Sequence, residues 1–242
     1  MGSIWSQTCS IGRRPPLRGH LKTQAAVVGA GMAGVLTAYA LQQAGLSVVV
    51  LEAGRIAGGQ TQNTTAKITS QHGLIYSRLI QSFGEETARR YAKANQDAVR
   101  AYQDLIDVQG ISCDWEERCA YLYGPDVTVL QEEAEAARRL GLPASFTREV
   151  SIPIPHDGAV RFEGQAQFHP LKFLKVLADQ LTIYEQSRVL TAEGDLLTTE
   201  LGSVQAEHIV FACHFPFVNF PGMYFARMHQ ERSYVLALQG AP

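Results

Sequence analysis

The chain has 242 residues, with 21 Lys and Arg against 23 Asp and Glu for a formal net charge of -2, and 46% of its residues are hydrophobic. These values are ordinary for one or two globular domains of about 100–200 residues each. A charge so close to neutral gives no electrostatic reason to bind nucleic acid or an anionic membrane, so we expect neither partner. Four scattered cysteines without a Cys-x-x-Cys pair predict no disulfide framework and no metal site, and they favour a reducing cytoplasm.

Two N-terminal segments partly resemble a targeting signal and a membrane-spanning helix. Residues 1–24 contain an arginine pair but lack the apolar core of about 7–15 residues that a secretory signal has, so we expect a polar arm. Residues 23–51 contain no charged residue and are long enough to cross a bilayer. Four glycines and a Gln pair interrupt this stretch, and its composition changes from β-branched to alanine-rich and back. We therefore expect strand, helix and strand here, and no membrane span.

The predicted elements alternate between helices and strands, which is typical of an α/β fold. Thr128 and Gln131 have capping-box spacing, and Pro170 suits the first turn of a helix. Three prolines between residues 143 and 155 place that segment at a sheet edge or in a loop. The predicted strands are residues 25–28, 47–51, 111–123, 183–190, 196–200, 208–213 and 233–238. The first predicted helix begins near Gly31 and ends at Gly45, and the second covers residues 85–109 and ends at Gly110. Two further helices are predicted over residues 128–140 and 171–181.

Residues 29–34, Gly-Ala-Gly-Met-Ala-Gly, form a GxGxxG motif between a predicted strand and a predicted helix. In a dinucleotide-binding site the first glycine permits a tight turn, the second lets the backbone approach a pyrophosphate, and the third lets the helix pack on the sheet. The helix N-terminus presents N–H groups to the anion. Glu52, which lies 18 residues after Gly34, can accept hydrogen bonds from a ribose diol and would repel a 2′-phosphate, an exclusion that the nearby Arg55 softens.

The alternative is a glycine-rich turn of another α/β fold with an incidental glutamate. The combination of strand, glycines, helix and acid favours dinucleotide binding over that alternative. It does not separate FAD from NAD, because both contain the same adenosine diphosphate portion.

Several segments carry a resemblance to a known family. Residues 51–61, which include Gly58-Gly59, resemble the strand end and second glycine pair of FAD-dependent oxidoreductases of the D-amino-acid oxidase, glycine oxidase and sarcosine oxidase type. Phe168-His169-Pro170-Leu171 resembles the family motif that opens a later helix, and residues 209–214 resemble its strand ending in an Ala-Thr-Gly-like turn. Residues 63–73 and 224–228 are similar to a bacterial branch that often carries a Rieske iron-sulfur domain.

The resemblance, which runs from about residue 24 to the end of the chain, implies an α/β fold in which a mixed-sheet substrate domain interrupts a discontinuous Rossmann-like FAD-binding domain. We expect residues 25–110 and 160–214 in the FAD-binding domain and residues 111–159 and 215–242 in the substrate domain. The implied cofactor is FAD. The implied reaction is oxidation of an amine or amino acid by hydride transfer to the flavin, with no catalytic base required and a Rieske-type electron acceptor as partner.

The resemblance also nominates cofactor-binding residues. Lys67 follows the glycine pair where family members place a basic residue close to the flavin, and it is the one candidate for a catalytic role; a solvated loop lysine is the alternative. Three threonines could bond the pyrophosphate or the ring edge, or satisfy a polar turn. The residues expected at FAD are Gly29, Gly31, Met32, Ala33, Gly34, Glu52, Ala53, Arg55, Gly59, Gln60, Thr61, Thr64, Thr65, Lys67, Val189, Ala212 and Cys213.

Several other residues have side chains that often act in catalysis or binding, but each of them also has a possible structural role. We expect His169 to cap a helix rather than to act as a base. Tyr224 and Arg227 fall in the predicted substrate sheet, where they bind a substrate carboxylate or form a structural ion pair. Cys113 and Cys119 are better interpreted as small strand residues than as a reactive pair.

The chain departs from the family pattern in two ways. Cys213 stands where the motif usually has Thr, which keeps a small side chain but weakens its hydrogen bonding. The sequence stops at Pro242, where resembling proteins continue, and it holds no Rieske ligand pattern. We therefore expect a C-terminally truncated chain that associates through an unpaired sheet edge. A fragment that cannot use flavin productively, a NAD-dependent enzyme and a nucleotide-binding module stay open as alternatives.

Overall fold

The structure is a computed structural model that describes residues 2–150, 155–215, 217–218, 222–231 and 233–234. The chain divides into two compact units. Unit 1 consists of Met1–Ile11 and Thr61–Val176, and unit 2 consists of Gly12–Gln60 and Leu177–Pro242. Among the described residues, each unit contains one β-sheet, which confirms the predicted α/β fold class.

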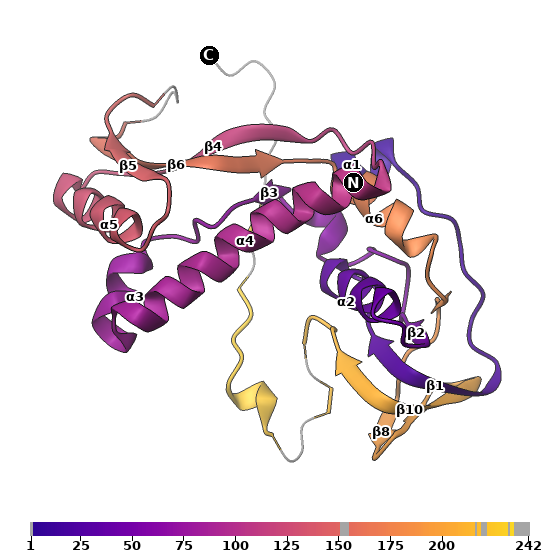
Figure 1. The fold of residues 1–242 in the computed structure, drawn as a ribbon. Helices are drawn as coiled ribbons and strands as arrows, with labels where there is room; N and C mark the ends of the chain where they lie inside the picture. Colours follow the sequence, from indigo (N-terminus) through magenta and orange to yellow (C-terminus); the bar gives the residue numbers. More distant parts are fainter. Residues whose placement is uncertain (1, 151–154, 216, 219–221, 232, 235–242) are drawn as a thin grey trace. The chain divides into compact units, whose positions relative to one another are not determined.

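Unit 2 contains a six-stranded sheet with the order β7-β2-β1-β10-β9-β8. Its elements are β1 Gly19–Val28, α2 Met32–Gln43, β2 Val48–Leu51, β7 Ile183–Tyr184, β8 Thr191–Glu193, β9 Leu196–Thr198, β10 Gly202–Phe211 and the 3-10 turn η2 Tyr224–Ala226. Neighbouring strands among β7, β2, β1 and β10 are parallel, and β9 and β8 pair antiparallel beside them. Helix α2 connects β1 to β2 and lies along these strands (Figure 1).

Apolar runs build the centre of this sheet. All four residues of β2 and the last four of β1 are buried, as expected for parallel strands that are covered on both faces. Val35 and Ala38 of α2 are buried as well. Alternate strand residues join an apolar cluster that consists of Leu17, Ala26, Val28, Val49, Leu51, Val189, Leu197, Val204 and Ala206. The strands whose ends carry the glycine motif and Glu52 are therefore anchored in a packed core.

Unit 1 contains a four-stranded antiparallel sheet in which β6 pairs with β3, β4 and β5. Its elements are α1 Ile4–Thr8, η1 Thr61–Asn63, β3 Lys67–Ile68, α3 Tyr76–Phe83, α4 Glu85–Gln109, β4 Glu116–Gly124, α5 Val127–Arg139, β5 Ala144–Thr147, β6 Gly158–Gln167 and α6 Pro170–Ala178, the last of which ends in unit 2. Among the described residues, no helix is both long and apolar enough to cross a membrane.

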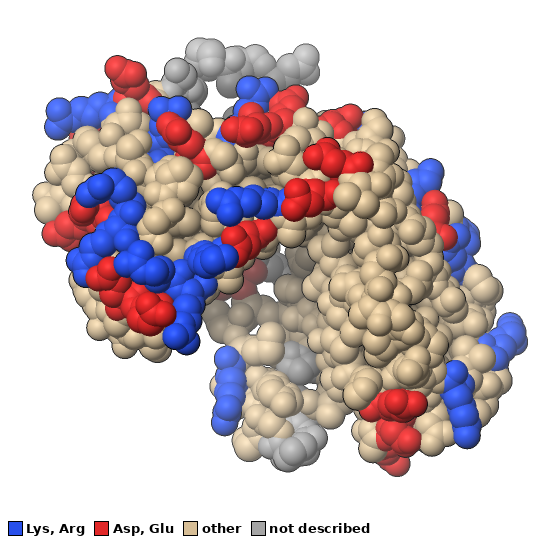
Figure 2. Space-filling model, viewed as in Figure 1, with Lys and Arg blue, Asp and Glu red and all other residues tan. Residues whose placement is uncertain are grey.

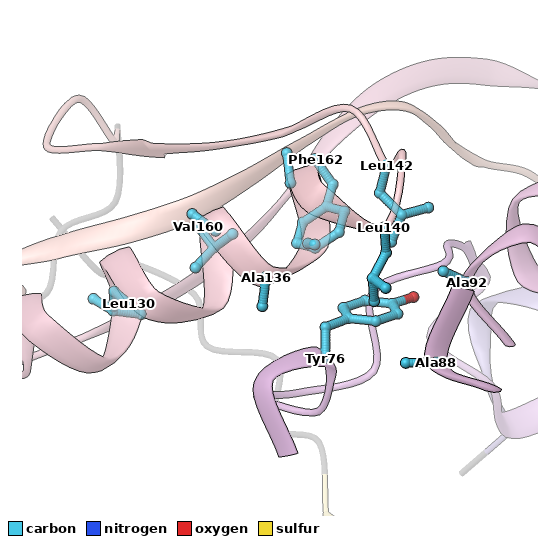
Figure 3. Close-up of a cluster of buried hydrophobic side chains, with 12 residues drawn as sticks. Tyr76, Ala88, Ala92, Leu130, Ala136, Leu140, Leu142, Val160 and Phe162 are labelled. Atoms are coloured by element: carbon cyan, nitrogen blue, oxygen red, sulfur yellow. The ribbon is translucent and has the colours of Figure 1, made fainter. Parts of the chain in front are cut away.

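Helices of unit 1 pack against one face of its sheet through a cluster centred on Tyr76 and Phe162 (Figure 3). Both side chains are fully buried, and their ring centroids lie 6.1 Å apart. Burial raises the pKa of the Tyr76 phenol, whose hydroxyl donates to the carbonyl oxygen of Ser70. The other buried members of the cluster are Ala88, Ala92, Leu130, Ala134, Ala136, Ala137, Leu140, Leu142, Ala144 and Val160.

A buried carboxylate fixes the start of α3. Glu133 of α5 is 2% exposed and accepts hydrogen bonds from the N–H groups of Ile75, Tyr76 and Ser77 at 2.8–2.9 Å. N–H groups at the start of an α-helix have no acceptor within the helix, and Ile75 supplies no side-chain cap. Glu133 therefore satisfies these donors, and they stabilise its buried charge.

Exposed charges of unit 1 are largely arranged as ion pairs. Glu85 contacts both Arg89 and Arg139, and Glu135 contacts Arg138 on α5. On the face shown in Figure 2, acidic side chains lie among and beside the basic ones. Exposed pairs of this kind contribute little to stability because water and salt screen them, so packing rather than surface charge holds the unit together.

The N-terminal segment differs from the predicted polar arm. Residues 4–8 form helix α1, and β1 begins at Gly19 because its first residues pair with β10 from Gly202 onward. Ile11 and Leu17 are buried, with exposed fractions of 8% and 1%. Backbone pairing, which composition does not reveal, brings this polar stretch into the sheet.

Three predicted elements need correction. β6, the strand that joins the whole sheet of unit 1, is absent from the predicted elements, since Gly158 and Gly164 weaken its strand pattern. The strand predicted over residues 183–190 ends at Tyr184. Asp126 rather than Thr128 caps α5, because the Asp126 side chain accepts from the Val129 N–H.

Other predicted elements agree with the structure or lie outside its described part. α4 covers the predicted residues 85–109, and Gly110 follows in the left-handed conformation at a φ of +60°. Much of the strand predicted at residues 233–238 lies outside the described residues. The two units also divide the chain differently from the predicted functional domains, since α4 belongs to unit 1. Those domains concern function and stay a prediction.

Candidate functional site

The carboxyl ends of β1, β2 and β10 meet at one edge of the unit 2 sheet. Val28, the last residue of β1, pairs with Leu51 of β2 and with Phe211 of β10. The Gly29 N–H donates to the Leu51 carbonyl oxygen at 2.8 Å, and the Ala212 N–H donates to the Val28 carbonyl oxygen at 2.9 Å. β2 and β10 flank β1 on opposite sides, which is the topological switch point where open α/β sheets bind ligands.

Two glycines of the motif have no room for a side chain. Gly29 has a φ of +107°, and a Cβ atom there would lie 3.0 Å from the Ala212 carbonyl oxygen. A Cβ atom on Gly34 would lie 1.8 Å from the Gly29 carbonyl oxygen, so α2 approaches the turn too closely for any larger residue. The structure thus gives Gly29 the turn and Gly34 the close helix packing that the motif predicts.

The first turn of α2 fits an anion. Gly31 is the N-cap of this helix, and Met32, Ala33 and Gly34 form its first turn, which contains no acidic residue. N–H groups at a helix start have no acceptor within the helix, and the helix dipole places partial positive charge there. Small side chains leave the backbone accessible, so this end of α2 suits a pyrophosphate.

Glu52 follows β2 and joins two loops. Its Oε2 accepts a hydrogen bond from the Ala30 N–H at 2.8 Å, and its Oε1 accepts one from the Gly54 N–H at 2.7 Å. An ionised carboxylate has about four acceptor positions, of which these bonds use two. The remaining positions can accept hydrogen bonds from a ribose diol, which is the role predicted for this residue.

Arg55 contacts Glu185, a residue that no motif in the sequence singles out. Its Nη1 donates to Oε2 of Glu185, a carboxylate that is 1% exposed and lies just beyond β7. The predicted softening of 2′-phosphate exclusion by Arg55 therefore needs revision, because a buried acid already pairs with the guanidinium. The sequence around Glu185 carries no signal of this burial, because Gln186, Ser187 and Arg188 follow it and make an exposed acid equally plausible.

The other predicted residues of unit 2 differ in burial. Val189 is 6% exposed and belongs to the apolar cluster of the sheet. Cys213 follows Ala212 at the end of β10, and burial raises the pKa of its thiol. Ala53, Gly59 and Gln60 are exposed in the loop after β2.

The three predicted threonines belong to unit 1. Thr61 lies in η1, and Thr64 and Thr65 are exposed beyond it. The Thr64 hydroxyl accepts from the Ala66 N–H at 3.2 Å, and its carbonyl oxygen accepts from Trp5 Nε1 at 2.8 Å. Thr64 thus stabilises a polar turn against which helix α1 packs, and contact of the three threonines with FAD stays a prediction.

Lys67 begins β3 and lies opposite Gln167 of β6 in antiparallel register. Its side chain is exposed, whereas the neighbouring Ala66 and Ile68 are 3% and 6% exposed. Lys67 is therefore a solvent-facing residue on an ordered strand rather than in a loop.

His169 is a helix cap, as predicted. Its Nδ1 accepts from the Lys172 N–H at 3.3 Å in the first turn of α6, and its Nε2 lies 2.9 Å from the Thr8 hydroxyl. The ring of Trp5 meets it edge-on with centroids 5.0 Å apart. Burial lowers the pKa of His169, and the nearby Lys172 ammonium adds to that effect. A neutral ring with Nε2–H donating to Thr8 satisfies both contacts.

Two other interpretations need correction. Tyr224 lies in η2 and Arg227 follows it, so these exposed residues belong to a 3-10 turn and not to a sheet. Cys113 lies in the loop before β4 rather than in a strand, and burial raises the pKa of its thiol to about 11. The Cys113 thiol is therefore protonated at neutral pH, which agrees with a structural role.

The chain matches the family model described as FAD dependent oxidoreductase, or DAO, over residues 24–242. The chain belongs to this family. Its relatives include YhfW of Bacillus subtilis, which is named as a Rieske 2Fe-2S iron-sulfur protein. YhfW is 35% identical over 249 aligned residues, which cover 98% of this chain and 49% of YhfW. The family confirms FAD as the cofactor and oxidoreductase as the class of protein.

A second relative is gamma-glutamylputrescine oxidoreductase of Escherichia coli, which is 26% identical over 77% of this chain and 47% of its own length. Among solved structures, L-amino acid deaminase from Proteus myxofaciens in complex with anthranilate has a TM-score of 0.67 at 18% identity, over 88% of this chain and 49% of that chain. This likeness shows the shared fold. The chain spans about half the length of these two curated relatives.

Proposed function

We propose that this chain forms the FAD-binding part of an enzyme that oxidises the C–N bond of an amine or amino acid. The observation that supports the proposal most is the meeting of the Gly29 turn, the start of α2 and Glu52 at one edge of the unit 2 sheet. The names of a DAO relative and of a protein with the same fold, a gamma-glutamylputrescine oxidoreductase and an L-amino acid deaminase, support a carbon–nitrogen bond as the reacting bond.

In this proposal the residues of unit 2 bind and orient the adenosine diphosphate part of FAD. N–H groups at the start of α2, including those of Ala33 and Gly34, donate to the pyrophosphate. Glu52 accepts from the ribose hydroxyls while its bonds to Ala30 and Gly54 keep it oriented. Glu52 repels a 2′-phosphate, which favours FAD and NAD over NADP-type ligands.

When bound, FAD supplies a flavin ring that takes up a hydride equivalent from the carbon bearing the nitrogen. None of the described residues is assigned the role of a base, because hydride transfer does not require one. Lys67 is the candidate that tunes the reduction potential, since a positive charge favours the more negative, reduced form. The other family-implied contacts at Ala53, Gly59 and Gln60 stay part of the proposal.

The substrate class is a small amine or amino acid. A Rieske-type iron-sulfur centre is the proposed electron acceptor, because YhfW is named for such a centre. Association through a sheet edge and a cytoplasmic location stay predictions from the sequence.

The experiment that tests the reaction class is anaerobic reduction of the FAD-loaded protein. A panel of primary amines, N-methyl amines and amino acids is mixed with it in the absence of oxygen, and bleaching of the flavin absorbance is followed. We expect at least one compound of this class to bleach the flavin and to yield the corresponding aldehyde, ketone or 2-oxo acid with ammonia or a smaller amine. Reduction by NADH, with none by any compound of the panel, would favour the nicotinamide-dependent alternative.

A further inference from the structure

Glu185 is a carboxylate with several donors and almost no solvent contact. It is 1% exposed. Its Oε1 accepts from the Ile56 N–H at 2.8 Å, and its Oε2 accepts from the Arg14 N–H at 3.0 Å and from Arg55 Nη1. A charge buried this deeply is stable only when it is paired and hydrogen-bonded. Glu185 therefore fixes the positions of these three groups around it.

The segment that carries Glu185 also fixes the backbone of Glu52. The Glu52 N–H donates to the Tyr184 carbonyl oxygen at 2.8 Å, and the Ser187 N–H donates to the Glu52 carbonyl oxygen at 2.8 Å. Glu185 lies between these two bonds in the sequence. The same short stretch after β7 thus holds the backbone of Glu52, the acid at the proposed ribose site. It also holds the side chain of Arg55, the arginine three positions later.

Two opposite charges lie in the loop that carries the proposed ribose site. Glu52 and Arg55 are opposite charges three positions apart in one loop. A nearby arginine is the residue type that accommodates the 2′-phosphate of NADP, whereas a glutamate alone excludes it. The Arg55 side chain is 38% exposed, but its guanidinium is paired with Glu185, so its charge is compensated and its position fixed. The negative charge of Glu52 then dominates the loop.

We propose that Glu185 sets the selectivity of the adenosine site: by compensating and anchoring Arg55, it makes the site accept an unphosphorylated ribose and exclude a 2′-phosphate. The inference rests on the proposed function, because it concerns the same site. Glu185 acts through Arg55 and is a positioning residue rather than a catalytic one.

The test compares two probes, ADP-ribose and its 2′-phosphate, both of which contain the adenosine diphosphate portion and lack flavin. Binding to the FAD-free full chain is measured by titration calorimetry at low salt. We expect the wild-type protein to prefer ADP-ribose. Glu185→Gln keeps the size of the side chain and removes its charge, so this preference should fall about fivefold, the effect of one partly exposed charge pair.

Two further variants separate positioning from simple stability. Arg55→Met leaves two carboxylates without the cation and should strengthen the preference for ADP-ribose. Arg55→Met combined with Glu185→Gln removes the cation together with its partner and should restore the wild-type ratio. Glu193→Gln, an exposed glutamate of the same unit, is the control for net charge and should leave the ratio unchanged.

If the role of Glu185 were only structural, Glu185→Gln would weaken the binding of both probes by the same factor. An unchanged ratio of the two affinities in this variant would overturn the proposal. If Glu185→Gln does not fold, Arg55→Met decides: a stronger preference supports the proposal and an unchanged one overturns it. Wild-type protein that binds neither probe contradicts the proposed function and this inference together. Binding of ADP-ribose with variant-independent selectivity contradicts the inference alone.

Discussion

Glu52 accepts a hydrogen bond from the Ala30 N–H at 2.8 Å, so the acid that follows β2 holds the glycine turn that follows β1, 22 positions earlier in the sequence. Its second oxygen accepts from the Gly54 N–H at 2.7 Å. The carboxylate is therefore oriented by the protein itself. Pre-organisation of this kind lowers the entropy that must be lost when a ligand binds.

Glu52→Ala should weaken FAD binding by about 1–3 kcal/mol, because charge-assisted hydrogen bonds to the ribose are lost. The measurement is titration of the FAD-free protein with FAD, followed by the quenching of flavin fluorescence. Glu193→Ala, an exposed glutamate of the same unit, should bind FAD like the wild type. Equal affinity of the Glu52 variant and the wild type would remove Glu52 from the site.

Gly34→Ala should destabilise unit 2 by more than about 3 kcal/mol or prevent its folding, because the new Cβ atom would meet the Gly29 carbonyl oxygen at 1.8 Å and the backbone cannot yield cheaply. Gly12→Ala is the matched control, since the nearest atom to its Cβ is the flexible end of Arg14 at 3.8 Å. Urea unfolding followed by circular dichroism measures both. Similar stability of the two variants would show that α2 does not pack as closely as described.

Lys67→Met should lower the reduction potential of bound flavin, because a positive charge that favours the reduced form is removed. The potential is measured by reductive titration against a reference dye in the FAD-loaded protein. Lys172→Met, which removes a surface lysine paired with Asp114, should leave the potential unchanged. A potential of Lys67→Met equal to that of the wild type would exclude the tuning role.

His169 should make the free energy of unfolding depend on pH below its ordinary pKa of 6.5. Burial lowers the pKa of the folded imidazole, so in the window just below 6.5 the unfolded chain binds more protons than the folded chain. Stability is then fully present above that pH and decreases as the pH falls toward the lowered value. Acidification should also remove the acceptor of the Lys172 N–H, because the added proton occupies Nδ1, whereas Nε2–H can still donate to Thr8.

The check is urea unfolding at a series of pH values for the wild type and for His169→Asn, which keeps a polar side chain at the helix start but cannot titrate there. We expect a smaller loss of stability on acidification in this variant. His208→Asn, which replaces an exposed histidine, should retain the wild-type dependence. Parallel pH profiles of wild type and His169→Asn would contradict the assigned cap.

Local patterns in the sequence were sufficient to predict the nucleotide-binding turn. The glycine motif, the apolar strands around it and Glu52 predict a strand–turn–helix–strand unit, and β1, α2 and β2 confirm it. Helix α4 was predictable for the same reason, because its amphipathic period and the stop at Gly110 are both local.

Long-range partners account for what the sequence did not reveal. The polar stretch from Gly19 joins the sheet only because its backbone pairs with that of β10. Strand β6 likewise depends on pairing with strands that precede it in the sequence. Glu185 has a role only through Arg55, which lies 130 positions earlier. Contacts across such separations leave no periodic trace in the residues between them.

The visible absorption spectrum of the purified chain, with identification of any released cofactor by mass, tests the central proposal most directly. We expect the protein to be yellow, either as isolated or after incubation with FAD and removal of the excess, and to release FAD when it is denatured. A colourless protein that takes up no FAD under these conditions, while it remains folded by circular dichroism, would contradict the proposal that this chain forms the FAD-binding part of the enzyme.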